Sequence, residues 1–249
     1  MKALAVEAIH TYYGLSHVLH GLSFEVREGE VVCLLGRNGA GKTTTIRSII
    51  GLTPPRQGRI AVFDREIQGK KPYEIFREGV RLIPQGRHVY PMLTVEENLR
   101  LGLVASGVRE VKEELEKAYT AYPVLKEKRN AKARTLSGGQ LQMVANARAL
   151  LGPVRLILMD EPTEGLSPLM IEQIGESILE MKQKGITVLL AEQHLQMALK
   201  VGDRHYIIDN GHLVFQGTTP ELEANEEVQA LYLGVSKKRI TSNQKGEDQ

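Results

Sequence analysis

The chain contains Gly36-Arg37-Asn38-Gly39-Ala40-Gly41-Lys42-Thr43, and this segment predicts its architecture more strongly than any other. The segment matches the pattern G-x-x-x-x-G-K-[ST], in which glycines let the backbone curl and point its N–H groups at phosphate oxygens. The apolar run Val31–Leu35 precedes it, and residues 43–50 are predicted to form a helix. Such a run is typical of a strand buried in a parallel sheet. We therefore expect a strand, a phosphate-binding loop and a helix whose positive end faces the phosphates.

Each residue of this loop has a predicted contact with a nucleotide. Lys42 would reach the β- and γ-phosphates as a point charge. The Thr43 hydroxyl is a predicted magnesium ligand, and Thr44 a further phosphate contact. The other predicted phosphate-binding positions are the remaining loop residues, Gly36, Arg37, Asn38, Gly39, Ala40 and Gly41. An ordinary glycine-rich turn is the alternative interpretation, but it does not explain the strand before the loop and the helix after it.

The segment Leu156-Ile157-Leu158-Met159-Asp160-Glu161-Pro162 places two acids at the end of an apolar strand. Buried carboxylates cost free energy unless a cation lies beside them. Because ligands of open α/β sheets bind at the carboxyl ends of the strands, we expect both acids near the phosphate loop. Asp160 is predicted to hold magnesium through its water shell, and Glu161 to polarise the attacking water. The alternative is that both acids cap the next helix.

A third segment, Leu136-Ser137-Gly138-Gly139-Gln140, precedes a helix predicted for residues 141–151. Ser-Gly-Gly at the start of a helix is a second candidate anion site. One chain has little use for two γ-phosphate sites, whereas a head-to-tail pair of chains can close each Ser-Gly-Gly over the ATP of the other. The alternative is that Ser137 is a simple N-cap.

These three segments, in this order, resemble the ATP-binding subunits of ABC transporters, and the resemblance covers residues 1 to about 235. It implies MgATP hydrolysis by a pair of subunits. Gln85, at the end of Arg81-Leu82-Ile83-Pro84-Gln85, is similar to the loop glutamine that senses magnesium and the attacking water. Tyr13 resembles the aromatic residue that stacks on adenine, with Tyr12 as the alternative and an aromatic packed on the core as a third interpretation.

The chain departs from the common family pattern at two places. Ser167 stands where most members have an aspartate that helps signalling across the dimer. At Glu192-Gln193-His194, an alignment without gaps puts Gln193 at the position of the family's switch histidine, and His194 next to it. Both stay candidates for the switch. With Tyr232-Leu233-Gly234, these departures resemble the importer branch for branched-chain amino acids, amides and urea.

The resemblance implies a function and a set of partners. The expected function is ATP hydrolysis that powers uptake of a small solute through two transmembrane permease subunits, with a solute-binding protein acting indirectly. A second ABC ATPase subunit, identical or related, would complete the dimer at the cytoplasmic face of the membrane. The alternative is an ABC ATPase of a lipid-export or soluble assembly system. Two other classes of protein are disfavoured. An ABC ATPase acting on nucleic acid or ribosomes usually has a coiled-coil insertion or two cassettes, whereas this sequence shows one cassette and no long heptad run. A switch GTPase has no use for Leu-Ser-Gly-Gly-Gln.

Composition agrees with this interpretation. The 249 residues are 42% hydrophobic and 25% charged, as in an ordinary globular protein. A formal net charge of only +2 argues against a nucleic-acid partner. The single cysteine, Cys33, lies in an apolar run and is predicted to be a buried thiol in a reducing compartment. The N-terminus does not resemble a signal peptide, and no window approaches the roughly 20 apolar residues of a spanning helix.

The expected fold is α/β: a P-loop ABC ATPase core with an N-terminal antiparallel β part and a helical insertion. The prediction is a single domain over residues 1–235, with its core at 1–85 and 150–235 and the insertion at 86–149. The polar tail 236–249 is predicted to be disordered. Strands are predicted at 4–9, 22–26, 31–35, 58–63, 80–84, 156–159, 187–191, 206–208 and 212–215. Helices are predicted from Thr94, and at 110–122, 141–151, 171–184 and 195–201.

Overall fold

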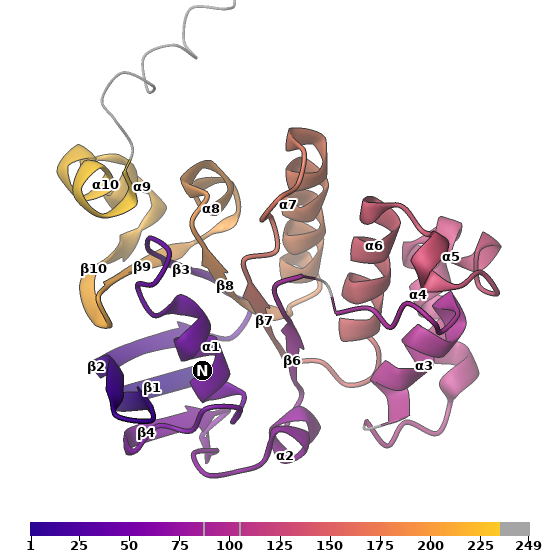
Figure 1. Cartoon of the computed structure of the whole chain (residues 1–249), viewed down its shortest axis with the longest axis horizontal. Coiled ribbons are helices and arrows are strands. Elements are labelled where there is room, and N and C mark those ends of the chain that lie inside the picture. Colours follow the sequence, from indigo (N-terminus) through magenta and orange to yellow (C-terminus); the bar gives the residue numbers. More distant parts are fainter. Residues whose placement is uncertain (87, 105, 235–249) are drawn as a thin grey trace, which may run out of the picture.

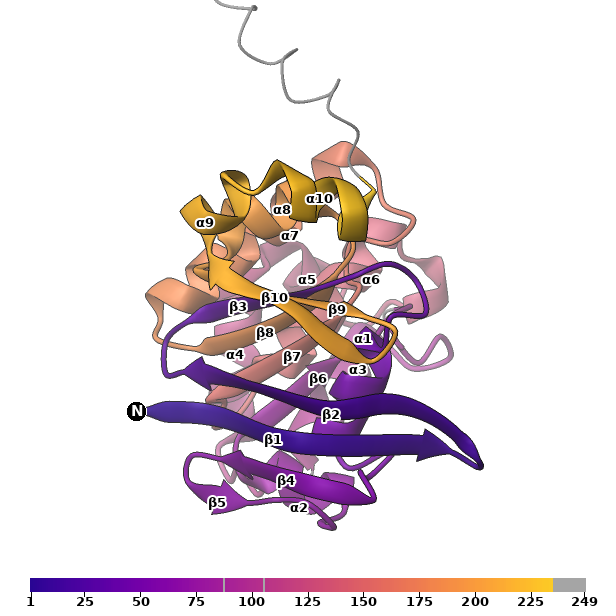
Figure 2. The ribbon, with the colours of Figure 1, turned by 90° about the vertical axis from the view of Figure 1, so that its left-hand side faces the viewer.

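The computed structural model describes residues 1–86, 88–104 and 106–234, and these residues form two sheets with helices around them (Figures 1 and 2). The antiparallel sheet has the strand order β2-β1-β4-β5. Its strands are β1 (Lys2–Tyr13), β2 (Ser16–Arg27), β4 (Gln57–Val62) and β5 (Arg65–Glu66). The predicted N-terminal antiparallel part is therefore confirmed. β1 and β2 are longer than predicted because bulges between Val6 and Tyr12 interrupt the alternation that marks a strand.

The second sheet has the order β10-β9-β3-β8-β7-β6, and every pair is parallel except β10 with β9. Its strands are β3 (Val31–Leu35), β6 (Val80–Ile83), β7 (Leu156–Asp160), β8 (Thr187–Glu192), β9 (Arg204–Asp209) and β10 (His212–Thr218). β3, β7 and β8 are buried along their whole length, as expected of parallel strands covered on both faces. The carboxyl ends of β3, β6, β7 and β8 therefore meet at one edge.

Helices cover both faces of the parallel sheet (Figure 1). α1 (Lys42–Ile49) lies between the two sheets, where Ile46 and Ile49 pack with Val32 and Leu34 of β3. Cys33 points to the other face, which α7 (Pro168–Gln183) and α8 (Leu195–Val201) cover, and its thiol is fully buried as predicted. Three further helices complete this part: α2 (Pro72–Arg77), α9 (Thr219–Glu223) and α10 (Glu226–Leu233).

The other helices gather beside the edge strand β6 (Figure 1). They are α3 (Val95–Val104), α4 (Val111–Ala121), α5 (Pro123–Glu127), the 3-10 turn Ala133–Thr135 and α6 (Gly138–Ala149). They share a separate apolar core that includes Leu99, Leu115 and Val144. Thr94 and Glu97 form the predicted capping box, in which the Thr94 N–H donates to the Glu97 carboxylate at 2.7 Å.

Three predictions concern the limits of this architecture. The α/β fold class with helices is confirmed. No helix within the described ranges is long and apolar enough to cross a membrane. The predicted disordered tail, 236–249, lies outside the described residues, as does Arg87 of the predicted insertion.

Candidate active site

The phosphate loop, the two acids and the switch candidates lie at the ends of strands that meet at the same edge of the parallel sheet. β3 leads into the phosphate loop, β7 ends at Asp160 and β8 ends at Glu192. The strand register aligns these ends, since Leu35 pairs with Glu192 and Asp160 pairs with Ala191. Segments more than 100 residues apart in the chain are therefore brought to one place by the crossover helices between the strands.

The phosphate loop wraps around the ammonium of Lys42. This side chain is 3% exposed, and its Nζ donates to the carbonyl oxygens of Gly36 at 2.8 Å and Arg37 at 3.1 Å. Nζ also lies 2.9 Å from a carboxylate oxygen of Glu161, the residue that follows β7. The lysine is thus held at the centre of the loop with its charge compensated by an acid from another strand.

Two glycines are required by the shape of the loop. Gly41 caps α1 with a φ of +115°, and a Cβ there would lie 2.8 Å from the side chain of Leu19. A Cβ on Gly36 would collide with the carbonyl oxygen of Ile208. The loop is also tied to the β9–β10 turn, because the Gly211 N–H donates to the carbonyl of Ala40 at 2.9 Å. Neighbouring strands therefore hold the curled backbone in place.

Thr43 and Asp160 meet at the start of α1. The Thr43 hydroxyl donates to Oδ1 of Asp160 at 3.0 Å. Burial raises the pKa of Asp160, and the hydrogen bond from Thr43 opposes this shift. A buried carboxylate next to a hydroxyl is an oxygen donor set that suits Mg²⁺. Within the described ranges no group of three or more His, Cys, Asp or Glu side chains could hold a metal, so phosphate oxygens and water would have to supply the other ligands.

Glu161 has an unusual backbone conformation, with a φ of +45°. Positive φ is uncommon for residues other than glycine, and it persists where the surrounding structure enforces it. Here the Glu161 N–H donates to the carbonyl of Ala191 at 2.9 Å. The side chain lines a cavity of about 420 Å³ at the sheet edge, together with Asn38, Gln193 and His194.

Gln85 follows β6 and reaches the same acids. Its amide nitrogen donates to Glu164 at 2.6 Å and lies 3.5 Å from a carboxylate oxygen of Glu161. The second contact is at the limit of a hydrogen bond, so Glu164 holds the glutamine more firmly. Glu164 was not among the predicted site residues.

The two switch candidates lie side by side at the cavity but are held differently. His194 is the N-cap of α8, and its Nδ1 accepts a hydrogen bond from the Met197 N–H at 3.2 Å. The Gln193 side chain is exposed and makes no hydrogen bond to the part of the chain that the structure describes. Gln193 is therefore free to turn towards a ligand, whereas His194 is partly occupied by its helix.

The two adenine candidates also differ in their surroundings. The ring of Tyr12 stacks on His17, with centroids 4.1 Å apart, and the Arg56 guanidinium lies 4.5 Å from its centroid. Tyr13, at the end of β1, is 42% exposed. Tyr13 consequently offers an accessible ring, while Tyr12 already has ring contacts within the chain.

Ser137 to Gln140 lie apart from the phosphate loop of the same chain. In Figure 1 the strands β6 and β7 lie between α1 and α6. Ser137 caps α6: the Gln140 N–H donates to its hydroxyl at 3.3 Å, and its own N–H donates to the Gln140 side chain at 3.1 Å. This reciprocal cap starts α6 at Gly138, before the predicted residue 141, because capping fixes a helix start that apolar periodicity does not reveal.

Sequence reasoning missed Glu192, the last residue of β8. Its side chain is 2% exposed and accepts hydrogen bonds from both loops that border the cavity. The signal was present in the sequence: Glu192 ends a buried apolar strand, as Asp160 ends β7. The resemblance drew attention to the neighbouring Gln193 and His194 instead.

Comparison with known proteins agrees with this geometry. The ABC transporter family matches residues 19–164, more than half of the chain, and the chain belongs to this family. The high-affinity branched-chain amino acid transport ATP-binding protein BraG of Pseudomonas aeruginosa is 39% identical over 231 residues, which are 93% of this chain and 99% of BraG. The lipopolysaccharide export system ATP-binding protein LptB of Escherichia coli K12 is 31% identical over 94% of this chain and 98% of LptB.

A solved ATP-binding cassette of an ABC transporter, in its ADP conformation, superposes with a TM-score of 0.80 at 33% identity. The match covers 90% of this chain and 94% of the cassette. The chain is therefore a nucleotide-binding ATPase of the ABC class.

Proposed function

We propose that this chain hydrolyses MgATP to power the uptake of a branched-chain amino acid, or a related amide, through separate membrane subunits. The observation that carries the hydrolytic part is the convergence of Lys42, Thr43, Asp160 and Glu161 at one sheet edge. The choice of solute rests on the likeness to BraG over almost the whole of both chains. The chain would work as a peripheral subunit at the cytoplasmic face of the membrane.

The roles of the residues follow from their contacts. Lys42 would exchange its ion pair with Glu161 for the β- and γ-phosphates, which releases the Glu161 carboxylate. Glu161 would then accept a proton from the attacking water. Thr43 and Asp160 would hold Mg²⁺, which neutralises charge on the phosphates when bound. Gln85 would sense the metal and the water, since its amide already lies between Glu161 and Glu164.

The remaining parts of the site would come from a second copy or a related subunit. Ser137, Gly138 and Gly139 lie at the N-terminus of α6. Among the helices of residues 1–86, 88–104 and 106–234, α1 alone begins at the phosphate loop. A head-to-tail partner would bring its Ser-Gly-Gly to this γ-phosphate. Tyr13 would stack on adenine, and Gln193 would contact the γ-phosphate as the switch.

The membrane subunits have a candidate docking groove. A cavity of about 380 Å³ lies between α2, β6, α3 and α6, and its lining is mostly apolar. Four of the large apolar side chains that line it are exposed: Leu52, Tyr73, Tyr90 and Leu101. A cluster of exposed apolar side chains in a groove is typical of a protein interface. We propose that permease helices dock here, near Gln85 at the end of β6.

The likeness to LptB makes lipid export the second candidate, and a soluble assembly role shares the same cassette. The solute is chosen by other chains, so transport has to be measured on the assembled complex. The chain would be co-expressed with the membrane and solute-binding proteins encoded beside it, purified and reconstituted in proteoliposomes. ATP-dependent uptake of leucine, which Glu161→Gln abolishes, is the expected result. Purification of the chain in complex with lipid-export components, or without any membrane subunit, would contradict the proposal.

A further inference from the structure

We propose that Glu192 is a positioning residue for hydrolysis, which holds the loop after β7 against the loop after β8. The loop after β7 carries Glu161, and the loop after β8 carries Gln193. Their relative placement would depend on one buried carboxylate. This inference rests on the proposed roles of Glu161 and Gln193.

The contacts of Glu192 divide evenly between the two loops. Oε1 accepts from the Thr163 hydroxyl at 2.5 Å and from the Thr163 N–H at 3.2 Å. Oε2 accepts from the N–H groups of Gln193 at 2.9 Å and His194 at 3.0 Å. One carboxylate oxygen therefore serves each loop, and the planar carboxyl group fixes the distance between them.

The chemistry of the four donors requires a carboxylate. An ionised carboxylate has two oxygens with about four acceptor positions and no donor. A carboxylate that is 2% exposed is tolerated only when its lost hydration is replaced, and here four donors replace it. Because these positions are filled, Glu192 has no free lone pair with which to take a proton from water. Its role is therefore to position other groups.

The site geometry explains why this placement affects the reaction. Thr163 follows Glu161 by two residues, and the Glu161 backbone has the positive φ that aims its side chain at the loop of Lys42. Glu161, Glu192 and Gln193 line the same cavity. Glu192 is anchored in turn by β8, which is buried along its whole length and pairs with β3 and β7. A misplacement of about 1 Å between a base and its reactant can cost roughly 100-fold in rate.

Glu192→Gln tests the inference, because it keeps the shape but replaces one acceptor oxygen with an NH₂ that cannot accept. We expect kcat per bound nucleotide to fall roughly 10- to 100-fold, while the Kd for ATP changes less than about threefold. Thr163→Val removes only the hydroxyl donor and should lower kcat less than Glu192→Gln does. Thr163→Ser keeps the hydroxyl, so its kcat should match that of the parent. In the double variant that combines Glu192→Gln and Thr163→Val, kcat should fall by less than the product of the two single-variant decreases. The reason is that both substitutions remove the same contact between Thr163 and Glu192.

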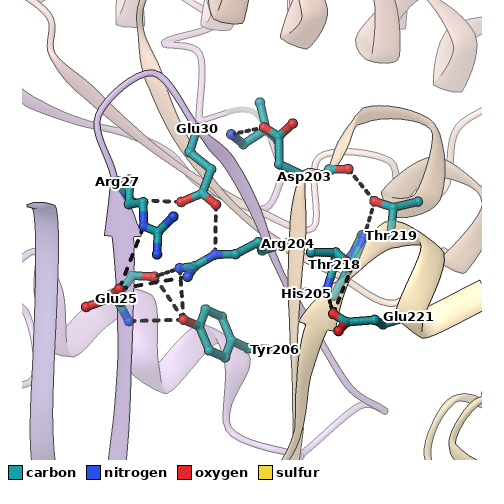
Figure 3. Close-up of polar contacts among 12 residues, drawn as sticks. Glu25, Arg27, Glu30, Asp203, Arg204, His205, Tyr206, Thr218, Thr219 and Glu221 are labelled. Carbon is teal, nitrogen blue, oxygen red and sulfur yellow. Dashed lines mark hydrogen bonds and ion pairs between the residues drawn. The ribbon is translucent and has the colours of Figure 1, made fainter. Parts of the chain in front are cut away.

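Glu30→Gln is the matched control. Glu30 precedes β3 at the opposite edge of the sheet, where it accepts from the Arg27 N–H and pairs with Arg204 (Figure 3). This variant should lower the Tm and leave kcat per bound nucleotide unchanged. Normalising turnover by nucleotide bound removes the effect of any unfolded fraction.

Two outcomes would overturn the inference. One is a folded Glu192→Gln protein whose kcat per bound nucleotide is within twofold of the parent. The other is a loss of kcat and of ATP affinity in parallel, as in a merely destabilised protein. If Glu192→Gln does not fold, Thr163→Val and Thr163→Ser decide alone: equal kcat in both contradicts the inference. Failure of the proposed function would look different, since Glu161→Gln would then hydrolyse ATP at the parent rate.

Discussion

The ammonium of Lys42 and the carboxylate of Glu161 form an ion pair at 2.9 Å, although the two residues stand 119 positions apart in the chain. Lys42 is almost fully buried and Glu161 is 13% exposed, so water screens the pair only weakly. The pair joins the phosphate loop to the predicted base of the hydrolytic reaction. In the proposed mechanism a phosphate that binds Lys42 would replace Glu161, so that nucleotide binding would also release the proposed base.

Lys42→Ala should therefore weaken ATP binding and turnover by roughly 100-fold or more, because it removes the one cation that the loop encloses. Calorimetric ATP titration and steady-state hydrolysis measure the two effects. Lys42→Arg is the control, since it keeps the charge but not the compact shape that fits between the loop carbonyls. Undiminished hydrolysis by a folded Lys42→Ala protein would contradict the site.

Glu161→Gln and Asp160→Asn should fail in different ways. Glu161→Gln keeps a hydrogen-bonding side chain but loses the base, so ATP should stay bound and a closed dimer should accumulate in size-exclusion chromatography with MgATP. Asp160→Asn removes the charge next to Thr43, so magnesium-dependent binding itself should weaken. Parent-rate hydrolysis by Glu161→Gln, or equal ATP binding by both variants, would reject these roles.

Ser137→Arg should block hydrolysis while a single subunit still binds ATP. The reason is that Ser137, at the start of α6, lies apart from the phosphate loop of its own chain. Mixed Ser137→Arg and Lys42→Ala chains can assemble at most one intact shared site. Turnover of the mixture should therefore exceed that of either variant alone. Full activity of the parent as a strict monomer at nanomolar concentration would rule out a shared site.

Gln193→Ala should lose most of the hydrolytic activity and His194→Ala should keep most of it. The reason is that His194 Nδ1 caps α8, whereas the Gln193 amide is free to donate to a phosphate. The measurement is steady-state ATP hydrolysis by the parent and by both variants. A collapse of activity in His194→Ala alone would identify His194 as the switch.

His205 should make the protein less stable in mild acid. It is fully buried, its Nε2 lies 2.8 Å from the Thr219 hydroxyl, and burial lowers its pKa from 6.5 to about 4. Below pH 6.5 the unfolded chain binds a proton that the folded chain does not, so the free energy of unfolding falls as the pH drops towards 4. The loss is about 1.4 kcal/mol per pH unit within this window.

Urea unfolding at pH 7, 6 and 5 measures this effect. His205→Gln keeps a hydrogen-bonding side chain for Thr219 but cannot titrate, so its stability should depend less on pH than that of the parent. The difference between parent and variant isolates His205 from other titrating groups such as Asp160, whose pKa burial raises. Equal pH dependence in both proteins would show that His205 is not the cause.

The sequence revealed those parts of the fold that local chemistry dictates. The phosphate loop has a unique glycine pattern, and β3, β7 and β8 are continuous apolar runs, so each was recognisable by itself. α8 was predicted with its observed limits. The helices α2, α5, α9 and α10 were not predicted. They have five to eight residues, about two turns of the helical period or fewer, although α8, with seven residues, was recognised.

The sequence by itself indicated which chemical groups the candidate site contains, because each motif specifies its groups within a few residues. Lys42 and Thr43 stand in the phosphate loop, and Asp160 and Glu161 stand together at the end of an apolar strand. Only the tertiary structure decided how they meet. The Lys42–Glu161 pair, the hold of Glu164 on Gln85 and the four-donor site of Glu192 all join segments that follow different strands. The strand order and register set these contacts, and they depend on packing across the whole sheet, which no local pattern contains.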